Sequence, residues 1–130
     1  MIVLDASAAI EWLLQTVAGH RIKTLVFANN ESLHAPHLLD LEVAQVLRRL
    51  LRDKLLTANR ANEAMQDLFD LRISRYPHFL FLPSIWHYRH VLSAYDAAYV
   101  ALAEGLGATL ITHDRRLASA SGVRAFIQVF

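Results

Sequence analysis

Apolar residues in this chain follow two different patterns. Residues 1–4 form a continuous apolar run, which is typical of a short strand buried on both faces. Between residues 38 and 51 the apolar positions instead recur every three or four residues, which predicts a helix with one buried side. The two patterns together indicate a protein built from both strands and helices.

The rest of the chain continues this alternation. Helices are expected after the candidate N-cap Ser7, over residues 20–29, after the candidate N-cap Thr57, and over residues 97–104, where Gly105 and Gly107 would end the helix. Further strands are expected at residues 33–35, 79–82, 108–112 and 126–130, with helical turns around residues 86–88 and 115–118.

Short apolar strands that alternate with amphipathic helices require crossover connections. The sequence therefore predicts an α/β fold, with a mainly parallel central sheet of four to five strands flanked by helices. No repeat, low-complexity tract or long linker interrupts the chain, so we expect one domain over residues 1–130. Ligands of such sheets bind beyond the carboxyl ends of the strands, which is where candidate chemistry should be sought.

Composition narrows the class of protein. Of 130 residues, 55% are hydrophobic and 19% are charged, which favours a globular chain over a disordered one. The absence of cysteine excludes a disulfide scaffold and thiolate metal sites. The start of the chain lacks the pattern of a cleavable leader, and no apolar run is long enough to cross a bilayer, so we expect a cytoplasmic protein that does not enter the membrane.

Charge gives only a weak indication of partners. The net charge is +1, whereas nucleic-acid-binding domains are usually markedly basic. Arginines are nevertheless clustered, and such clusters either form a solvated surface or contact phosphates. Arg49 and Arg52 share one predicted helix face, and Arg115 and Arg116 follow the predicted strand at 108–112, so these four are the candidate contacts for substrate phosphates.

Four acidic residues stand out by their positions. Asp5 and Asp114 follow predicted strands, Asp96 lies in the first turn of a predicted helix, and Glu42 lies near the start of the helix at residues 38–51. Each has an ordinary local explanation, such as helix capping or a solvent-facing boundary position. Their positions also place all four near the carboxyl edge of the sheet, where they would form one acidic pocket.

Converging carboxylates repel one another unless a cation lies between them. Mg²⁺ and Mn²⁺ prefer oxygen ligands and retain water, and such ions can activate water toward a phosphodiester. The hydroxyl groups of Ser7 and Thr112 would lie beside Asp5 and Asp114 and could bind a metal-associated water or a phosphate oxygen. This spacing does not distinguish RNA, DNA and small phosphate esters as substrates.

Other residue types give weaker indications. The seven histidines lack the ligand spacing of a zinc site. Exposed aromatic residues could stack on RNA bases, although packing in the core or in an interface is the more common role of such side chains. The aromatic residues considered for stacking are Trp12, Trp86, Tyr88, Tyr95 and Tyr99.

Four segments, taken in order, resemble the motifs of PIN-domain nucleases, and in particular the VapC-type toxins of bacterial toxin–antitoxin pairs. The segments read IVLDAS at residues 2–7, AP through EV at residues 35–43, SAYDAAY at residues 93–99 and LITHD at residues 110–114. Each motif alone is weak, whereas the ordered set covers essentially the whole chain.

The resemblance implies an endoribonuclease that depends on Mg²⁺ or Mn²⁺. The acids that match the family motifs are Asp5, Glu42, Asp96 and Asp114, with Ser7 and Thr112 as supporting residues. The resemblance also implies a homodimer, an RNA substrate and a cognate antitoxin, whose C-terminal segment wraps the toxin and can place a basic side chain in the acidic site.

The chain departs from the family pattern after Thr112. His113 stands where other residues are more common, and Arg115, Arg116 and Leu117 follow Asp114 where some relatives carry a further acid. A surface-loop position is the simplest expectation for His113. Two other functions remain open at this point: a housekeeping RNA-processing nuclease with the same fold, and a catalytically inactive module that binds RNA or protein.

Overall fold

The computed structural model describes all residues 1–130 and contains five strands and seven α-helices. The strands form one sheet with the order β3-β2-β1-β4-β5, and every neighbouring pair is parallel. This confirms the predicted α/β fold with a parallel sheet. The strands are β1 Ile2–Leu4, β2 Leu33–Pro36, β3 Ile73–Tyr76, β4 Thr109–Thr112 and β5 Ile127–Val129.

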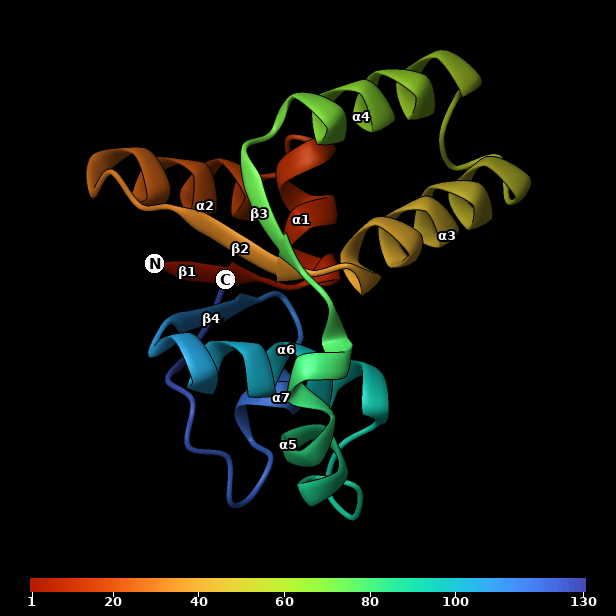
Figure 1. The fold of residues 1–130 in the computed structure, drawn as a ribbon. Helices are drawn as coiled ribbons and strands as arrows, with labels where there is room; N and C mark the ends of the chain where they lie inside the picture. Colours follow the sequence, from red (N-terminus) through yellow and green to blue (C-terminus); the bar gives the residue numbers. More distant parts are fainter.

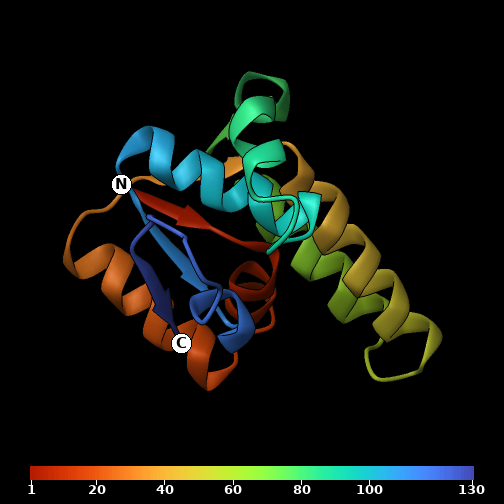
Figure 2. The same cartoon turned by 90° about the horizontal axis from the view of Figure 1, so that it is seen from below.

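Helices cover both faces of this sheet (Figure 1). The helices are α1 Ala6–Leu13, α2 Val17–Ala28, α3 Leu38–Arg52, α4 Ala58–Asp70, α5 Leu82–His87, α6 Ala94–Leu106 and α7 Arg115–Ala118. Figure 2 shows α1 and α2 on one side of the strands and α6 on the other. Helices α3 and α4 form a hairpin that extends away from the sheet.

The central strands and helix α6 form the core. Every residue of β1 is buried, as the apolar run at residues 1–4 predicts for a central strand. Helix α6 is buried over the whole stretch from Ala97 to Ala103 and packs across β1, β2 and β4. Gly107 ends α6 in a left-handed conformation with φ +63°, which a glycine adopts without steric cost.

The predicted strand at residues 79–82 is wrong. Residues His78–Phe81 form a 3₁₀ helix that leads into α5, and the strand that pairs with β2 lies earlier, at Ile73–Tyr76. The apolar run was misleading because Phe79 and Leu80 are exposed by 74% and 65%. The real strand is at the edge of the sheet and is only partly buried, so it lacks a strong apolar pattern.

The N-terminal cap of α1 also differs from the prediction. Asp5, rather than Ser7, caps the helix, because its carboxylate accepts the Ala8 N–H. Ser7 lies inside the first turn of α1, and its hydroxyl is free for other contacts. The predicted cap of α4 at Thr57 is confirmed, and Ser93 caps α6. None of the helices combines the length and the apolar character needed to cross a lipid bilayer.

Candidate active site

Asp5 is held firmly at the carboxyl end of the central strand β1. Its backbone N–H donates to the Ile111 carbonyl of the neighbouring strand β4 at 3.1 Å. One oxygen of its carboxylate accepts the Ala8 N–H at 2.9 Å and the Ser7 hydroxyl at 2.7 Å, and the residue is only 6% exposed. Capping α1 therefore fixes one carboxylate oxygen of Asp5 and sets the orientation of the other.

The hydroxyl groups of Ser7 and Thr112 join the ends of β1 and β4. The two oxygens are 3.2 Å apart, and the Ser7 hydroxyl also accepts the His113 N–H at 2.8 Å. Thr112 is fully buried, and its hydroxyl accepts the Asp114 N–H at 3.0 Å. This network positions the loop that carries Asp114 relative to Asp5.

Two helices bring further acids to the same edge of the sheet. Ser93 caps α6 by accepting the Asp96 N–H at 3.1 Å, so Asp96 lies in the first turn of the helix. Tyr99, one turn further along α6, donates its hydroxyl to Glu42 of α3 at 2.6 Å. Because Tyr99 is buried, this hydrogen bond fixes the Glu42 carboxylate against α6.

Asp114 has a different environment, because it is paired with an arginine. It caps the short helix α7 by accepting the Arg116 N–H at 3.0 Å. The Arg116 guanidinium also donates to both Asp114 oxygens, at 3.1 and 2.8 Å, although the arginine side chain is itself 89% exposed. Asp114 therefore already has a cationic partner within the chain.

The pKa shifts of the four acids reflect these environments. Burial raises the pKa of Asp5, Glu42 and Asp96, and the charges of neighbouring acids raise them further. Hydrogen bonds from Ser7 and Ala8 to Asp5, and from Tyr99 to Glu42, offset part of this effect. Hydrogen bonding to Arg116 instead lowers the pKa of Asp114. Ionisation of Asp5, Glu42 or Asp96 therefore destabilises the folded protein, whereas Asp114 is stabilised in its charged form.

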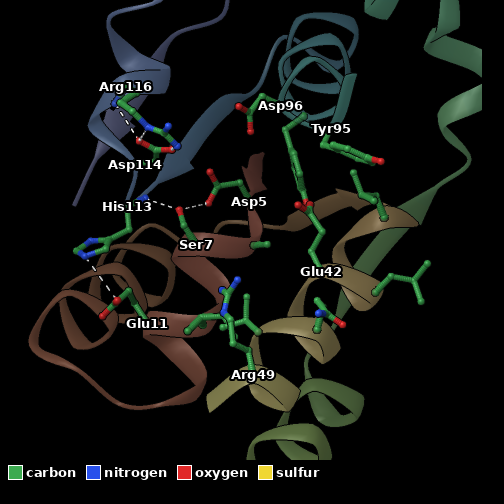
Figure 3. Close-up of a pocket in the computed structure, with 17 residues that line it drawn as sticks. Asp5, Ser7, Glu11, Glu42, Arg49, Tyr95, Asp96, His113, Asp114 and Arg116 are labelled. Atoms are coloured by element: carbon green, nitrogen blue, oxygen red, sulfur yellow. Dashed lines mark hydrogen bonds and ion pairs between the residues drawn. The ribbon is translucent and has the colours of Figure 1, made fainter. Parts of the chain in front are cut away.

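All four acids line one cavity of about 670 Å³, which is within the ~300–1,000 Å³ range of ligand pockets. Figure 3 shows the side chains of Asp5, Glu42, Asp96 and Asp114 around this space, with Ser7 beside Asp5. The other labelled residues that line it are Glu11, Arg49, Tyr95, His113 and Arg116. The structure therefore brings together residues from α1, α3, α6 and α7 and from the segments that directly follow β1 and β4.

Not every predicted residue lies in this cavity. Thr112 is not part of the lining, but its buried hydroxyl contacts the lining residues Ser7 and Asp114. Of the four arginines, Arg49 and Arg116 line the cavity, whereas Arg52 and Arg115 do not. Arg52 instead forms an exposed ion pair with Asp53, its neighbour in sequence. The cavity therefore gives no support to the prediction that Arg52 and Arg115 contact substrate phosphates.

Sequence reasoning missed two features of the cavity. Glu11 adds a fifth carboxylate to the lining, and its position four residues after Ser7 on α1 could have indicated a shared helix face. The Tyr99–Glu42 hydrogen bond joins residues 57 positions apart, and no local pattern in the sequence indicates such a contact. Both features depend on how the helices pack around the sheet.

His113 lies at the rim of the cavity and is bonded on both sides. Its Nδ1 lies 2.5 Å from the Phe130 carbonyl oxygen, and its Nε2 lies 3.5 Å from a Glu11 carboxylate oxygen. The side chain is 44% exposed, in agreement with the expected surface-loop position. His113 therefore joins the end of β4 to α1 and to the segment after β5.

The donor groups of the cavity suit a hard divalent cation better than zinc or copper. They are carboxylate and hydroxyl oxygens, with no sulfur and with one histidine at the rim. No three histidine, aspartate or glutamate side chains are arranged as a ready-made cage for an ion. Mg²⁺ is typically held by one or two carboxylates and keeps several waters, so its chemistry fits acids spaced in this way.

Comparison with known proteins agrees with this geometry. The family model described as the PIN domain matches residues 2–123. Ribonuclease VapC9 of Mycobacterium tuberculosis is 43% identical over 129 residues, which cover 99% of this chain and 98% of that protein. The similarity therefore extends over all the segments that carry the four acids.

Solved structures show the same fold at lower sequence identity. VapC20 of Mycobacterium tuberculosis, described as a sarcin-ricin loop cleaving toxin, matches with a TM-score of 0.65 at 14% identity, covering 95% of this chain and 96% of that one. VapBC2 of Rickettsia felis, bound to a DNA fragment from its promoter, matches with a TM-score of 0.63 at 12% identity, covering 99% and 98%. From its family-model match and its 43% identity to a curated relative, this chain belongs to the PIN-domain family and is a relative of the VapC ribonucleases.

Proposed function

We propose that this protein is a metal-dependent endoribonuclease and the toxin of a toxin–antitoxin pair. The observation that carries the proposal is the convergence of Asp5, Glu42, Asp96 and Asp114 in one cavity at the carboxyl edge of a parallel sheet. Ligands of α/β sheets bind at this edge. The 43% identity to a protein named Ribonuclease VapC9 supports RNA as the substrate.

In this proposal the four acids hold Mg²⁺ or Mn²⁺. When bound, the ion supplies Lewis-acid chemistry that activates water and stabilises the charge that develops on a phosphodiester. Asp5 and Glu42 are oriented for this role before an ion arrives, by Ser7 and Tyr99 respectively. Ser7 and Thr112 act as positioning residues, because their hydrogen bonds fix the loop of Asp114 relative to Asp5.

An antitoxin partner is supported by two observations. VapBC2 of Rickettsia felis shares the fold over nearly its whole length. The cavity also contains five carboxylates against two guanidinium groups, so a basic side chain from a partner would be attracted into it. We propose that a cognate antitoxin inhibits the protein by occupying this cavity.

A homodimer is supported by exposed apolar side chains around the 3₁₀ helix and α5. Phe79, Leu80 and Trp86 are 74%, 65% and 67% exposed, and Leu82 is 48% exposed. A cluster of large apolar side chains at a surface is a common mark of a protein interface. Light scattering of the purified protein tests this point: a single monomeric species at micromolar concentration would reject the homodimer.

The test of the nuclease is cleavage of RNA by the purified protein with Mg²⁺ or Mn²⁺, compared with the same reaction in excess EDTA. We expect cleavage only with the ion, and strongly reduced cleavage from a folded Asp96→Asn variant. Full activity in EDTA would reject the metal-dependent mechanism. Absence of cleavage, together with a melting temperature that millimolar Mn²⁺ does not change, would favour an inactive binding module.

The toxin assignment is tested separately, by expression in a bacterial host. We expect growth to stop when the wild-type protein is made and to continue when the Asp96→Asn variant is made. Co-expression of the protein encoded by a small neighbouring gene should restore growth. Cleavage in vitro without growth arrest would instead indicate an RNA-processing nuclease.

A further inference from the structure

The α3 side of the cavity carries, besides the proposed metal ligand Glu42, residues that the proposed metal chemistry does not use. Glu42, Gln45, Val46 and Arg49 all line the cavity, and they are spaced at i, i+3, i+4 and i+7 along α3. This spacing places them on one face of the helix. Arg49 therefore lies two turns from Glu42, about 10 Å along the helix axis.

Arg49 is the unpaired guanidinium of the cavity. The second arginine there, Arg116, is bonded to both oxygens of Asp114. The Arg49 guanidinium has no ion pair and no hydrogen bond within the chain, and the residue is exposed. Figure 3 shows its side chain directed from α3 toward the space between Ser7 and Glu42. An anionic ligand would therefore meet a free positive charge here.

Tyr95 is the second unused group. It lies in the first turn of α6 directly before Asp96, it lines the cavity, and it is 62% exposed. The hydroxyl groups of the other three tyrosines, Tyr76, Tyr88 and Tyr99, are all hydrogen-bonded within the chain. Tyr95 makes no such bond, and in Figure 3 it projects beyond Glu42, on the other side of that residue from Arg49. Its ring is therefore available to a ligand.

From these positions we infer that Tyr95 and Arg49 hold an unpaired segment of RNA across the acids, with the Tyr95 ring stacked on a base and the Arg49 guanidinium bound to a backbone phosphate. This inference rests on the proposed nuclease function and specifies the form of its substrate. An aromatic ring can stack on a base only if that base has left its own stack, so a duplex cannot use Tyr95. The substrate is therefore a single-stranded or looped RNA.

Spacing and charge agree with this arrangement. The two helical turns between Glu42 and Arg49 correspond to about three nucleotides, at a rise of roughly 3.4 Å per stacked nucleotide. A phosphate near Arg49 is thus a few nucleotides away from the acids. Five carboxylates line the cavity and would repel an RNA backbone, so a fixed cation beside them is needed to hold the strand.

The experiment measures binding without cleavage. A fluorescent oligoribonucleotide is titrated with the full-length protein in EDTA at several salt concentrations, once unpaired and once annealed to its complement. We expect the wild-type protein to bind the unpaired strand more tightly. Tyr95→Leu should weaken binding of the unpaired strand about tenfold and leave duplex binding unchanged, whereas Tyr95→Phe should bind like the wild type.

Arg49→Ala should weaken binding of both forms and reduce the slope of log affinity against log salt concentration by about 1. The matched controls are Arg48→Ala, an exposed arginine on the same helix outside the cavity, and Phe69→Leu, an aromatic residue of α4 that is 77% exposed. Both controls should bind RNA like the wild type. An equal effect of Arg48→Ala and Arg49→Ala would show a diffuse basic surface and overturn the proposal.

Other outcomes separate this inference from the proposed function. Three results would overturn the inference, even if the protein cleaves RNA with Mg²⁺. They are equal affinity for unpaired and duplex RNA, no RNA binding at all, and a Tyr95→Leu variant that binds unpaired RNA as tightly as the wild type. The two variants could also lose binding of the antitoxin while retaining binding of RNA, and this result would assign the pair of residues to the protein partner. Selective binding of unpaired RNA without any cleavage would support the inference and reject the nuclease.

Discussion

The starts of helices α6 and α7 carry the same kind of residue in opposite electrostatic environments. Asp96 lies in the first turn of α6 and Asp114 caps α7, and both face one cavity. Burial and the Asp114 charge raise the pKa of Asp96. Two hydrogen bonds from the Arg116 guanidinium lower the pKa of Asp114. The comparison teaches that a helix start can position an acid, whereas its partners decide whether its charge is tolerated.

The largest expected effect distinguishes the two acids by activity. Asp96→Asn should reduce RNA cleavage about 10²-fold or more, on the scale of removing one electrostatic group from a preorganised site. Asp114→Asn should have the smaller effect, because the Asp114 carboxylate is already neutralised in part by Arg116. Single-turnover cleavage rates at saturating Mg²⁺ measure both, and circular dichroism checks the fold. A larger loss from Asp114→Asn would reverse the comparison.

The second prediction concerns stability against pH without a divalent ion. Because the pKa of Asp96 is raised in the folded protein, the protonated carboxyl stabilises the fold below its ordinary pKa of 3.8. This contribution is lost as the pH rises through the raised value. Asp96→Asn should therefore melt at a higher temperature than the wild type at pH 7 in EDTA, and the two should converge near pH 4.

Asp114→Asn provides the opposite arm of this test. Its lowered pKa means that the Asp114 charge stabilises the fold above pH 3.8, and that this contribution is lost as the pH falls through the lowered value. Asp114→Asn should therefore melt below the wild type at pH 7, while asparagine still serves as a helix cap. Shifts of the same sign for both variants would contradict the opposite environments.

The third prediction separates capping from the site itself. Ser93→Ala removes the cap of α6, and Thr57→Ala removes the cap of α4, away from the cavity. Each should cost about 1 kcal/mol of unfolding free energy, measured by urea denaturation. Only Ser93→Ala should also reduce the rise in melting temperature that Mn²⁺ produces, because it alone loosens the turn that carries Asp96. If Ser93→Ala and Thr57→Ala lose the same amount of the Mn²⁺-induced rise in melting temperature, the Ser93 cap does not position Asp96.

The smallest expected effect concerns the arginine that distinguishes the two helix starts. Arg116→Ala removes the partner of Asp114, whereas Arg115→Ala changes a neighbouring arginine outside the cavity. The affinity for Mn²⁺, measured by calorimetry, should rise by less than about tenfold in Arg116→Ala and stay unchanged in Arg115→Ala, since exposed ion pairs contribute little. Weaker Mn²⁺ binding by Arg116→Ala would indicate that the arginine supports the ion and does not compete with it.

Sequence patterns predicted the central part of the fold better than its edge. The strands at the middle of the sheet are continuous apolar runs because helices cover both faces, and β1 and β4 were placed correctly for this reason. The edge strand β3 is only partly buried, and its Arg75 pairs with Asp40 of α3. Such a strand resembles a loop in its composition, so the sequence pattern favours the apolar residues 79–82 instead.

For the candidate site, the sequence indicated which acids would meet but not how each would be held. Strand ends and helix starts are local features, and the topology of a parallel sheet brings them to one edge. The Tyr99–Glu42 hydrogen bond and the inclusion of Glu11 depend on the packing of α1, α3 and α6. Arg52 follows Glu42 by ten residues on α3, which turns it about 80° away around the helix, so helix geometry alone could have indicated its exclusion from the cavity.

The central position of β1 has a consequence for when the protein becomes active during its own synthesis. Strand β1 leaves the ribosome before the other four strands, yet one of its two partners is β4, more than a hundred residues later. Until α6 and β4 have emerged, β1 has an open edge, and Asp5 lacks both Asp96 and Asp114. A nascent or truncated chain that ends before β4 therefore has an incomplete acidic site, so a ribosome making this protein is not exposed to a finished nuclease until translation of the domain is nearly complete.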